Sequence, residues 1–277
     1  MTSKTQATLR SILITVVIIW CLAPFFWLGM TSLKLGDPAL NDPNLFRGPF
    51  GLDNYIAVFN QGFLFNLRNS FIVASMTTVI TILSGMSAAY ALAKLPVRGR
   101  LGLMTLVLAA SLFPPVALVP PLYEVWRGLG LLSTWEGLYI SYISFSLPLA
   151  IFILLTFFSA IPAELKEAAT TDGATPLQTF RMVMLPLATP GIVSAAIITF
   201  VTAWNEFLLA STFAPRNAEV AQTMPVAIAA FTGAIEYQRP IGTLTAASII
   251  VTLPMILFAL LMQRRIVAGL TAGAVKG

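Results

Sequence analysis

Charged residues are spread unevenly along the chain and leave six long stretches without any. These stretches are residues 11–33, 69–93, 101–123, 137–163, 182–205 and 240–263. An α-helix needs about 20 apolar residues to cross the hydrocarbon core of a bilayer, and each stretch exceeds that length. The pattern predicts an all-α membrane protein with six transmembrane helices in a single domain, residues 1–277. The predicted spans lie at about 11–33, 69–93, 101–123, 137–158, 187–210 and 241–262.

The composition agrees with a membrane protein and excludes several kinds of chemistry. Of the 277 residues, 57% are hydrophobic and 10% are charged, whereas about 25% are charged in a soluble domain. The absence of histidine excludes histidine-based metal sites, proton relays and catalytic triads. The single cysteine, Cys21, can form no internal disulfide. Since Gly-Lys never occurs, there is no Walker A loop, and another chain must bind any ATP that the protein needs. We expect no enzyme activity in this chain.

Lysine and arginine are distributed unequally between the loops on the two sides of the predicted bilayer. Ten of the 16 lie in the loop set that contains both termini, and six lie in the longer opposite set. The first set comprises residues 1–10, 94–100, 159–181 and 264–277. Because positive residues collect on the cytoplasmic side, both termini are expected in the cytoplasm.

Two predicted spans carry features beyond hydrophobicity. The third contains Phe113-Pro114-Pro115 and Pro120-Pro121, and we expect these prolines to kink or break the helix. The second has a surface of small residues, which allows close helix approach. These residues are Ser84, Gly85, Ser87, Ala88, Ala89 and Ala91. The two features fit a bundle that lines a pathway.

The cytoplasmic loop 159–186 is predicted to contain two helices separated by a sharp turn. Residues 163–169 form a helix-favouring run after Pro162, and Asp172-Gly173 ends it, with Gly173 suited to a left-handed conformation. Thr175 and Gln178 then match a capping box that starts a second helix. We expect Leu177, Phe180 and Met184 on one face of this helix, and Pro186 at its end.

We call residues 163–186 the cytoplasmic elbow, and expect Ala168 and Ala169 to be exposed at its bend. Small residues there would let a partner surface approach closely. The alternative is an amphipathic hairpin lying on the membrane surface, which requires a basic polar face. The first helix instead carries Glu164 and Glu167 against Lys166 alone, which does not favour that alternative.

The elbow resembles the EAA loop of the membrane subunits of ABC importers. The resemblance is carried by Glu167-Ala168-Ala169, Asp172-Gly173-Ala174, Phe180 and Leu185-Pro186. Further segments are similar to carbohydrate importers, above all to the second permease subunit of trehalose/maltose-type systems. These segments are Asn54-Tyr55, Trp204-Asn205-Glu206 and residues 263–277, with Glu206 where the family often has Asp.

The resemblance implies a type I importer permease fold and half of a sugar translocation pathway in a bacterial cell membrane. It implies a homologous second permease, two ATPase subunits that bind ATP and Mg, and an extracytoplasmic sugar-binding protein. The chain itself would hold no cofactor or metal and would contact no nucleic acid. The implied ATPase-coupling residues are Glu167, Ala168, Ala169, Asp172, Gly173, Ala174, Phe180 and Pro186.

Two further groups of residues are candidates for contact with sugar or with the binding protein. Trp204 and Asn205 offer stacking area and amide hydrogen bonds, and Glu206 is the one charge within the predicted spans. Glu206 is left with two possible roles, in the sugar pathway or as a structural or gating residue. The resemblance implies that an outer loop around Phe231-Thr232-Gly233 reaches into the binding protein, whereas a re-entrant segment that seals the bundle remains the alternative.

An ion-coupled secondary transporter of a small solute is the competing functional hypothesis. Such a carrier needs titratable residues within the membrane, and the predicted spans contain one carboxylate and no histidine. It also gives no reason for the cytoplasmic elbow. The sequence therefore favours the ABC permease.

Overall fold

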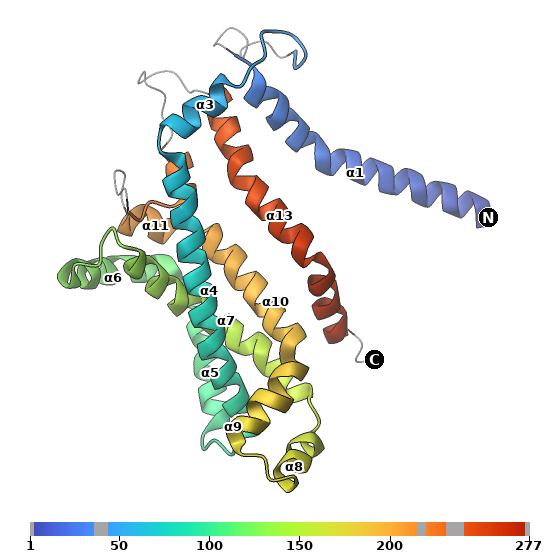
Figure 1. Ribbon diagram of the computed structural model, residues 1–277, viewed down its shortest axis with the longest axis vertical. Helices are drawn as coiled ribbons and strands as arrows, with labels where there is room; N and C mark the ends of the chain where they lie inside the picture. Colours follow the sequence, from blue (N-terminus) through green and yellow to red (C-terminus); the bar gives the residue numbers. More distant parts are fainter. Residues whose placement is uncertain (1–2, 36–43, 215–219, 231–240, 275–277) are drawn as a thin grey trace. The chain divides into compact units, whose positions relative to one another are not determined.

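The computed structural model describes residues 3–35, 44–214, 220–230 and 241–274, and in this part the chain is helical apart from turns and one isolated bridge between Lys34 and Phe50 (Figure 1). In chain order the helices are α1 (Ser3–Leu33), α3 (Asp53–Asn60), α4 (Phe63–Lys94), α5 (Arg100–Ser111), α6 (Pro115–Leu129), α7 (Trp135–Ala160), α8 (Ala163–Thr171), α9 (Pro176–Gln178), the π-helix η1 (Thr179–Met184), α10 (Leu185–Trp204), α11 (Leu208–Phe213), α12 (Met224–Ala229) and α13 (Ile241–Ala274). The all-α prediction is confirmed.

Five of the helical segments in the described residues are long and apolar enough to cross a membrane. They are Gln6–Leu33, Phe63–Lys94, Trp135–Ala160, Pro176–Trp204 and Ile241–Met262. A sixth candidate is the pair α5 and α6, which together are long and apolar enough to cross a membrane and are bent by 89° at the break between them. Counted as one broken span, this pair gives the six spans expected from the charge pattern.

The break between α5 and α6 lies at the proline cluster that the sequence singled out. Helix α5 ends at Ser111, and α6 restarts at Pro115, which occupies its first turn. Pro114 has an extended conformation (φ −69°, ψ 122°), as the residue before a proline prefers. Pro120 and Pro121, in contrast, lie inside α6 without interrupting it. The predicted break is therefore confirmed at the first proline pair, whereas the second pair does not break the helix.

The chain divides into two compact units. The first comprises residues 1–64 and 228–254, and the second comprises residues 65–227 and 255–277.

In the first unit, one asparagine links three helices. The side-chain nitrogen of Asn54, on α3, donates to the backbone oxygens of Ser32 (2.9 Å) and Lys34 (2.7 Å) at the end of α1. Its side-chain oxygen accepts from the hydroxyl of Thr243, near the start of α13, at 3.2 Å. These bonds satisfy carbonyl groups that a helix end leaves without intrahelical partners. Asn54 thereby fixes the end of α1 and the start of α13 to α3.

The second unit has two buried clusters, one at each end of α7. The first surrounds Leu138, Tyr142 and Trp204 and draws on α4, α6, α7, α10 and α11. The second surrounds Leu154 and Phe158 and draws on α4, α7, η1 and α10. Helix α7 packs chiefly against α10 and α5. The second cluster lies next to the cytoplasmic elbow and positions it.

The small-residue surface predicted on the second span lies on α4 and contacts α7. Gly85 and Ala89 are buried, and a Cβ at Gly85 would lie 3.3 Å from Cδ1 of Leu154. A larger residue at 85 would push the two helices apart. The prediction of close helix approach is confirmed at these two positions, whereas Ser84 and Ser87 are exposed.

Candidate functional site

The first helix of the cytoplasmic elbow, α8, ends in a Schellman motif. The backbone N–H of Gly173 donates to the carbonyl of Thr170 (3.1 Å), and the N–H of Ala174 donates to the carbonyl of Ala169 (2.9 Å). This pairing requires a left-handed residue, and Gly173 has φ +82°. Glycine takes this conformation without steric cost. The predicted stop at Asp172-Gly173 is confirmed, with Asp172 at the C-cap.

The second helix of the elbow starts two residues later through the predicted capping box. The N–H of Gln178 donates to the hydroxyl of Thr175 at 3.3 Å, and the side chain of Gln178 accepts from the N–H of Thr175 at 2.8 Å. Pro176 occupies the first turn, where its missing N–H removes no hydrogen bond. The local sequence therefore fixes both sides of the bend. Figure 1 shows α8 and α9 next to each other at one end of α7.

The expectation that Pro186 ends the second helix is wrong. The helical segment continues from Pro176 to Trp204, and Pro186 lies in the first turn of α10. The π-helix η1, Thr179–Met184, comes directly before it, and the N–H of Leu185 donates five residues back to the carbonyl of Phe180. A proline ring clashes with the carbonyl four residues earlier in a regular α-helix. The wider π turn removes that conflict, so the chain passes from the elbow into the membrane span without a break.

Two expectations about exposure on the elbow are also corrected. Ala168 is exposed as expected, but Ala169 is only 8% exposed, because α8 packs against η1. Phe180 and Met184 face the core, whereas Leu177 is 63% exposed. The π-helix changes the angular step between residues, so the three do not share one face.

The core-facing side of the elbow packs through aromatic rings. Phe180 lies 4.7 Å from Tyr90 of α4 and 6.3 Å from Phe158 of α7, measured between ring centroids. Tyr90 and Phe158 contact each other edge to face at 5.8 Å. Such pairs are worth about 0.5–1.5 kcal/mol beyond their buried area. Phe180 is therefore placed to connect the elbow with two spans.

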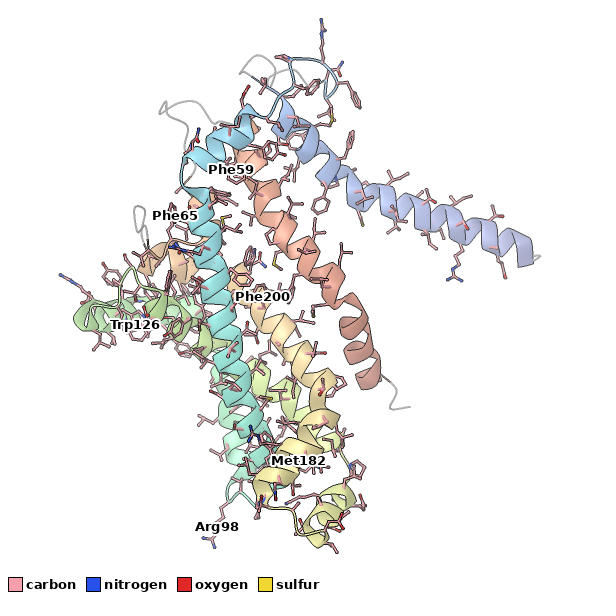
Figure 2. The ribbon with its side chains drawn as sticks, viewed as in Figure 1. Phe59, Phe65, Arg98, Trp126, Met182 and Phe200 are labelled. Atoms are coloured by element: carbon pink, nitrogen blue, oxygen red, sulfur yellow. The ribbon has the colours of Figure 1, made fainter. Side chains whose placement is uncertain are left out.

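The outer side of the elbow combines acidic and apolar side chains. Glu164, Glu167 and Asp172 are all exposed. Leu177, on α9, is also exposed, and Met182 of η1, labelled in Figure 2, is 73% exposed. Large apolar side chains on a surface with fixed charges are typical of a site that binds a protein partner.

Two lysines join the adjacent ends of α4, α7 and α8, a role that the sequence did not indicate. The ammonium of Lys166, on α8, donates to the backbone carbonyl of Lys94, the last residue of α4, at 2.8 Å. The ammonium of Lys94 donates to the carbonyl of Ile161, the C-cap of α7, at 2.5 Å. A cation at a helix C-terminus meets carbonyls without intrahelical partners and the negative end of the helix dipole.

The candidate sugar-pathway residues occupy three different environments. Trp204 is 2% exposed, stacks on Phe200 with ring centroids 5.9 Å apart, and has an indole N–H without an acceptor among the described residues. Asn205 is exposed, and its side chain donates to the carbonyl of Val201 at 2.8 Å. The tryptophan is thus a core residue at the end of α10, and the asparagine folds back on the same helix.

Glu206 caps the short helix α11. Its two carboxylate oxygens accept from the backbone N–H groups of Leu209 (2.8 Å) and Ala210 (3.0 Å). The hydroxyl of Tyr142, on α7, is buried near this carboxylate. Both oxygens thus serve a helix start. The sequence left two roles open for Glu206, and this geometry favours the structural one.

A polar cluster at the start of α4 is a further feature that the sequence did not indicate. The side chains of Asn66 and Asn69 both donate to the backbone oxygen of Gln222, at 3.0 and 3.1 Å. The hydroxyl of Ser70 accepts from the N–H of Met224 at 2.8 Å. The three residues follow the i, i+3, i+4 spacing of one helix face. This spacing is the feature of the sequence from which the cluster could have been predicted. The predicted contact segment Phe231-Thr232-Gly233 lies outside the described residues.

Comparison with known proteins places these features in a family. The sequence profile of the family described as "Binding-protein-dependent transport system inner membrane component" matches residues 81–271. The trehalose transport system permease protein SugB of Mycobacterium tuberculosis is 45% identical, over 98% of this chain and 98% of its own length. The trehalose/maltose transport system permease protein MalG of Thermococcus litoralis is 40% identical, over 93% and 92%.

A solved structure supports the fold independently. A chain from the crystal structure of a bacterial ABC transporter involved in the import of alginate, an acidic polysaccharide, aligns with a TM-score of 0.79 and 22% identity. The alignment covers 94% of this chain and 96% of that chain. At this identity the likeness concerns the fold alone, and it agrees with the fold inferred from the sequence.

Proposed function

Because this chain belongs to the family of binding-protein-dependent transport system inner membrane components, we propose that it is one of two permease subunits of an ATP-driven sugar importer. Trehalose or maltose is the proposed sugar. The names of the two relatives above support this class of substrate, and their similarity extends over almost the whole chain. In this role the chain is a transport component, and it forms half of the translocation pathway.

The geometry of the cytoplasmic elbow is the observation that carries the proposal. The Schellman motif at Gly173 and the capping box at Thr175 give the bend a defined shape. The exposed acidic and apolar side chains form a compact outer surface, whereas Phe180 fixes the inner surface to α4 and α7. When a partner displaces a projection of such defined shape, the displacement is transmitted to the spans that it packs against.

The proposed partners supply what this chain does not. A homologous second permease completes the pathway, two ATPase subunits bind ATP and Mg, and an extracytoplasmic binding protein delivers the sugar. The assembly lies in a bacterial cytoplasmic membrane. The residues assigned to ATPase coupling are Glu167, Ala168, Ala169, Asp172, Gly173, Ala174, Phe180 and Pro186. Of these, Ala169 is buried where α8 packs against η1, and Glu167 and Asp172 are exposed, so that a partner can reach them.

The proposed cycle is alternating access driven from the elbow. ATP binding brings the two ATPase subunits together and moves the elbows seated on them, and the spans turn from inward-open to outward-open. Sugar then passes from the binding protein into the membrane cavity, and hydrolysis resets the assembly. ATP binding does this work because it favours one of two arrangements of the spans. Glu206 keeps α11 in place during the cycle.

Purification and transport in vesicles test the proposal. The chain is expected to co-purify with an ATPase subunit, and the reconstituted assembly is expected to take up trehalose or maltose only when ATP and the loaded binding protein are present. Uptake by this chain alone under an ion gradient would instead support the secondary transporter. A binding protein that retained neither disaccharide would contradict the proposed substrate.

A further inference from the structure

Helix α4 differs from the other long apolar helices of the described chain in containing no proline. Proline lies inside four of the five apolar segments of the described chain, at Pro24, Pro148, Pro190 and Pro254. The segment Phe63–Lys94 contains none. Proline removes a backbone hydrogen bond and kinks a helix. A regular helix of 32 residues is about 48 Å long, at about 1.5 Å per residue. Helix α4 is therefore a continuous helix that is long enough to cross the bilayer.

The cytoplasmic end of α4 is bonded to the elbow. We call the contacts of Lys94, Ile161 and Lys166 the inner joint. The ammonium of Lys166 reaches from α8 to the terminal carbonyl of α4, while the ammonium of Lys94 reaches back to the end of α7. Glu164 and Lys166 are among the charges that act on Lys94. Lys166 is only partly exposed, in contrast to Glu164 and Glu167 on the same helix.

The opposite end of α4 is bonded to the segment that follows α11. We call the contacts of Asn66, Asn69 and Ser70 with Gln222 and Met224 the outer joint. The three α4 side chains are at most 9% exposed. Asn66 donates to both oxygens of Gln222, at 3.0 Å to the backbone and 3.1 Å to the side chain. Breaking such bonds in a buried site leaves polar groups without partners, which is costly. These bonds therefore hold Gln222 and Met224 against α4.

The outer joint is further fixed by α7. The side-chain oxygen of Asn69 accepts from the indole N–H of Trp135 at 3.2 Å and from the guanidinium of Arg68 at 3.3 Å. The guanidinium of Arg68 lies over the rings of Phe65 and Trp135, at 5.3 and 5.5 Å from their centroids. The fully buried Asn69 thus has partners for both its amide nitrogen and its oxygen.

We infer that α4 is the rigid link that carries movement of the elbow to the extracytoplasmic segment Gln222–Met224, and that Lys166 is the positioning residue that attaches the elbow to it. The inference rests on the proposed function and adds a route across the membrane. A displacement of α8 draws the carbonyl end of α4 with it. Because α4 is one continuous helix without proline, the same displacement reaches Asn66, Asn69 and Ser70 and moves the segment bonded to them. The ATPase side and the binding-protein side are coupled through one helix.

The inner joint is tested by Lys166→Met in the complete reconstituted importer. Methionine keeps an apolar stem of similar length and removes the donor to Lys94. The number of sugar molecules imported per ATP hydrolysed is expected to fall about fivefold or more, the lower range of typical coupling between sites. Lys166→Arg keeps a cationic donor and is expected to restore the ratio. The control is Thr171→Val, on the same helix, where the exposed hydroxyl donates only to the carbonyl of Glu167.

The ratio separates positioning from simple stability. A variant that is merely less stable lowers uptake and ATP hydrolysis together and leaves their ratio unchanged. A normal ratio in Lys166→Met would overturn the role of Lys166. If the wild-type importer itself takes up no sugar with ATP, the proposed function fails, so the two failures are distinguishable.

The outer joint is tested without altering either lysine. In a Cys21→Ser chain, Asn66→Cys and Gln222→Cys are joined by a short thiol-specific cross-linker. If α4 and the segment move as one body, the cross-linked importer is expected to keep the uptake of the uncross-linked double variant. Loss of uptake on cross-linking would overturn the inference, because it would show that the two must separate during transport.

Discussion

The left-handed turn at Gly173 allows the sharpest test of the elbow. A Cβ added there would meet no heavy atom within 4 Å. Any effect of Gly173→Ala or Gly173→Val therefore arises from the backbone, which has φ +82°, and not from a clash. The left-handed conformation costs an L-residue about 1–2 kcal/mol. A β-branched residue suffers more, and asparagine less.

The expected result is a graded loss of coupling. For alanine, about 1.4 kcal/mol corresponds to a tenfold change in the balance between the bent elbow and an opened one. If the turn opens, the bonds from the N–H groups of Gly173 and Ala174 are lost as well, at about 0.5–1.5 kcal/mol each. We predict that sugar imported per ATP falls in the order Gly, Asn, Ala, Val at position 173, measured in proteoliposomes with all subunits and the binding protein.

Gly130 provides a matched control. It also follows a helix in the left-handed region (φ +69°), and a Cβ there likewise meets no heavy atom within 4 Å. Gly130→Val therefore imposes the same kind of strain away from the elbow, and it should lower thermal stability without changing the sugar-to-ATP ratio. Full coupling in Gly173→Val, or equal uncoupling in both variants, would refute the reasoning.

Three further predictions follow from single contacts. Thr175→Ala removes the cap of α9 and should destabilise the elbow by about 1 kcal/mol, visible as faster proteolysis near residue 175, while Thr175→Ser should behave as wild type. Gly242→Ala brings a Cβ to 2.6 Å from the side-chain nitrogen of Asn54, which is held by two carbonyls. Thermal unfolding should show that the protein loses about 1–3 kcal/mol of stability. Gly102→Ala, where a Cβ meets no atom within 4 Å, should cause no loss of stability. Glu206→Ala removes both acceptors at the start of α11 and should lower the free energy of unfolding by about 1.5–3 kcal/mol. Glu206→Gln should lose less stability and keep the apparent KM for sugar. A changed KM at unchanged stability would show instead that Glu206 acts in the sugar pathway.

The features that the sequence predicted correctly depend on short-range signals. Charge-free runs indicate spans because a segment that crosses the bilayer must be apolar along its whole length, wherever its neighbours in the fold lie. The capping box at Thr175 and the glycine stop at Gly173 use residues within a few positions of each other. The proline pair at 114–115 breaks its span for an equally local reason. The 89° angle of that break depends on packing and could not be predicted.

The features that were missed depend on residues far apart in the chain. The bonds from Asn66 and Asn69 to Gln222 join positions more than 150 residues apart. The burial of Ala169 follows from the packing of α8 on η1, and the π-helix itself has no simple sequence signature. Lysines in a cytoplasmic loop are normally taken as topology signals. The hydrogen bonds of Lys94 and Lys166 show that they also hold helix ends together.

The central claim, that an ATPase moves this chain through the elbow, is tested most directly by cross-linking from Ala168. Ala168 is exposed on α8 and Ala169 is buried beside it, so Ala168→Cys in a Cys21→Ser chain presents one thiol at the proposed contact. The account predicts a thiol cross-link from this position to the co-purified ATPase subunit, with a yield that changes when ATP is added. The account would be contradicted if the thiol at position 168 reacted freely with a labelling reagent in the assembled complex and never formed a cross-link to an ATPase chain.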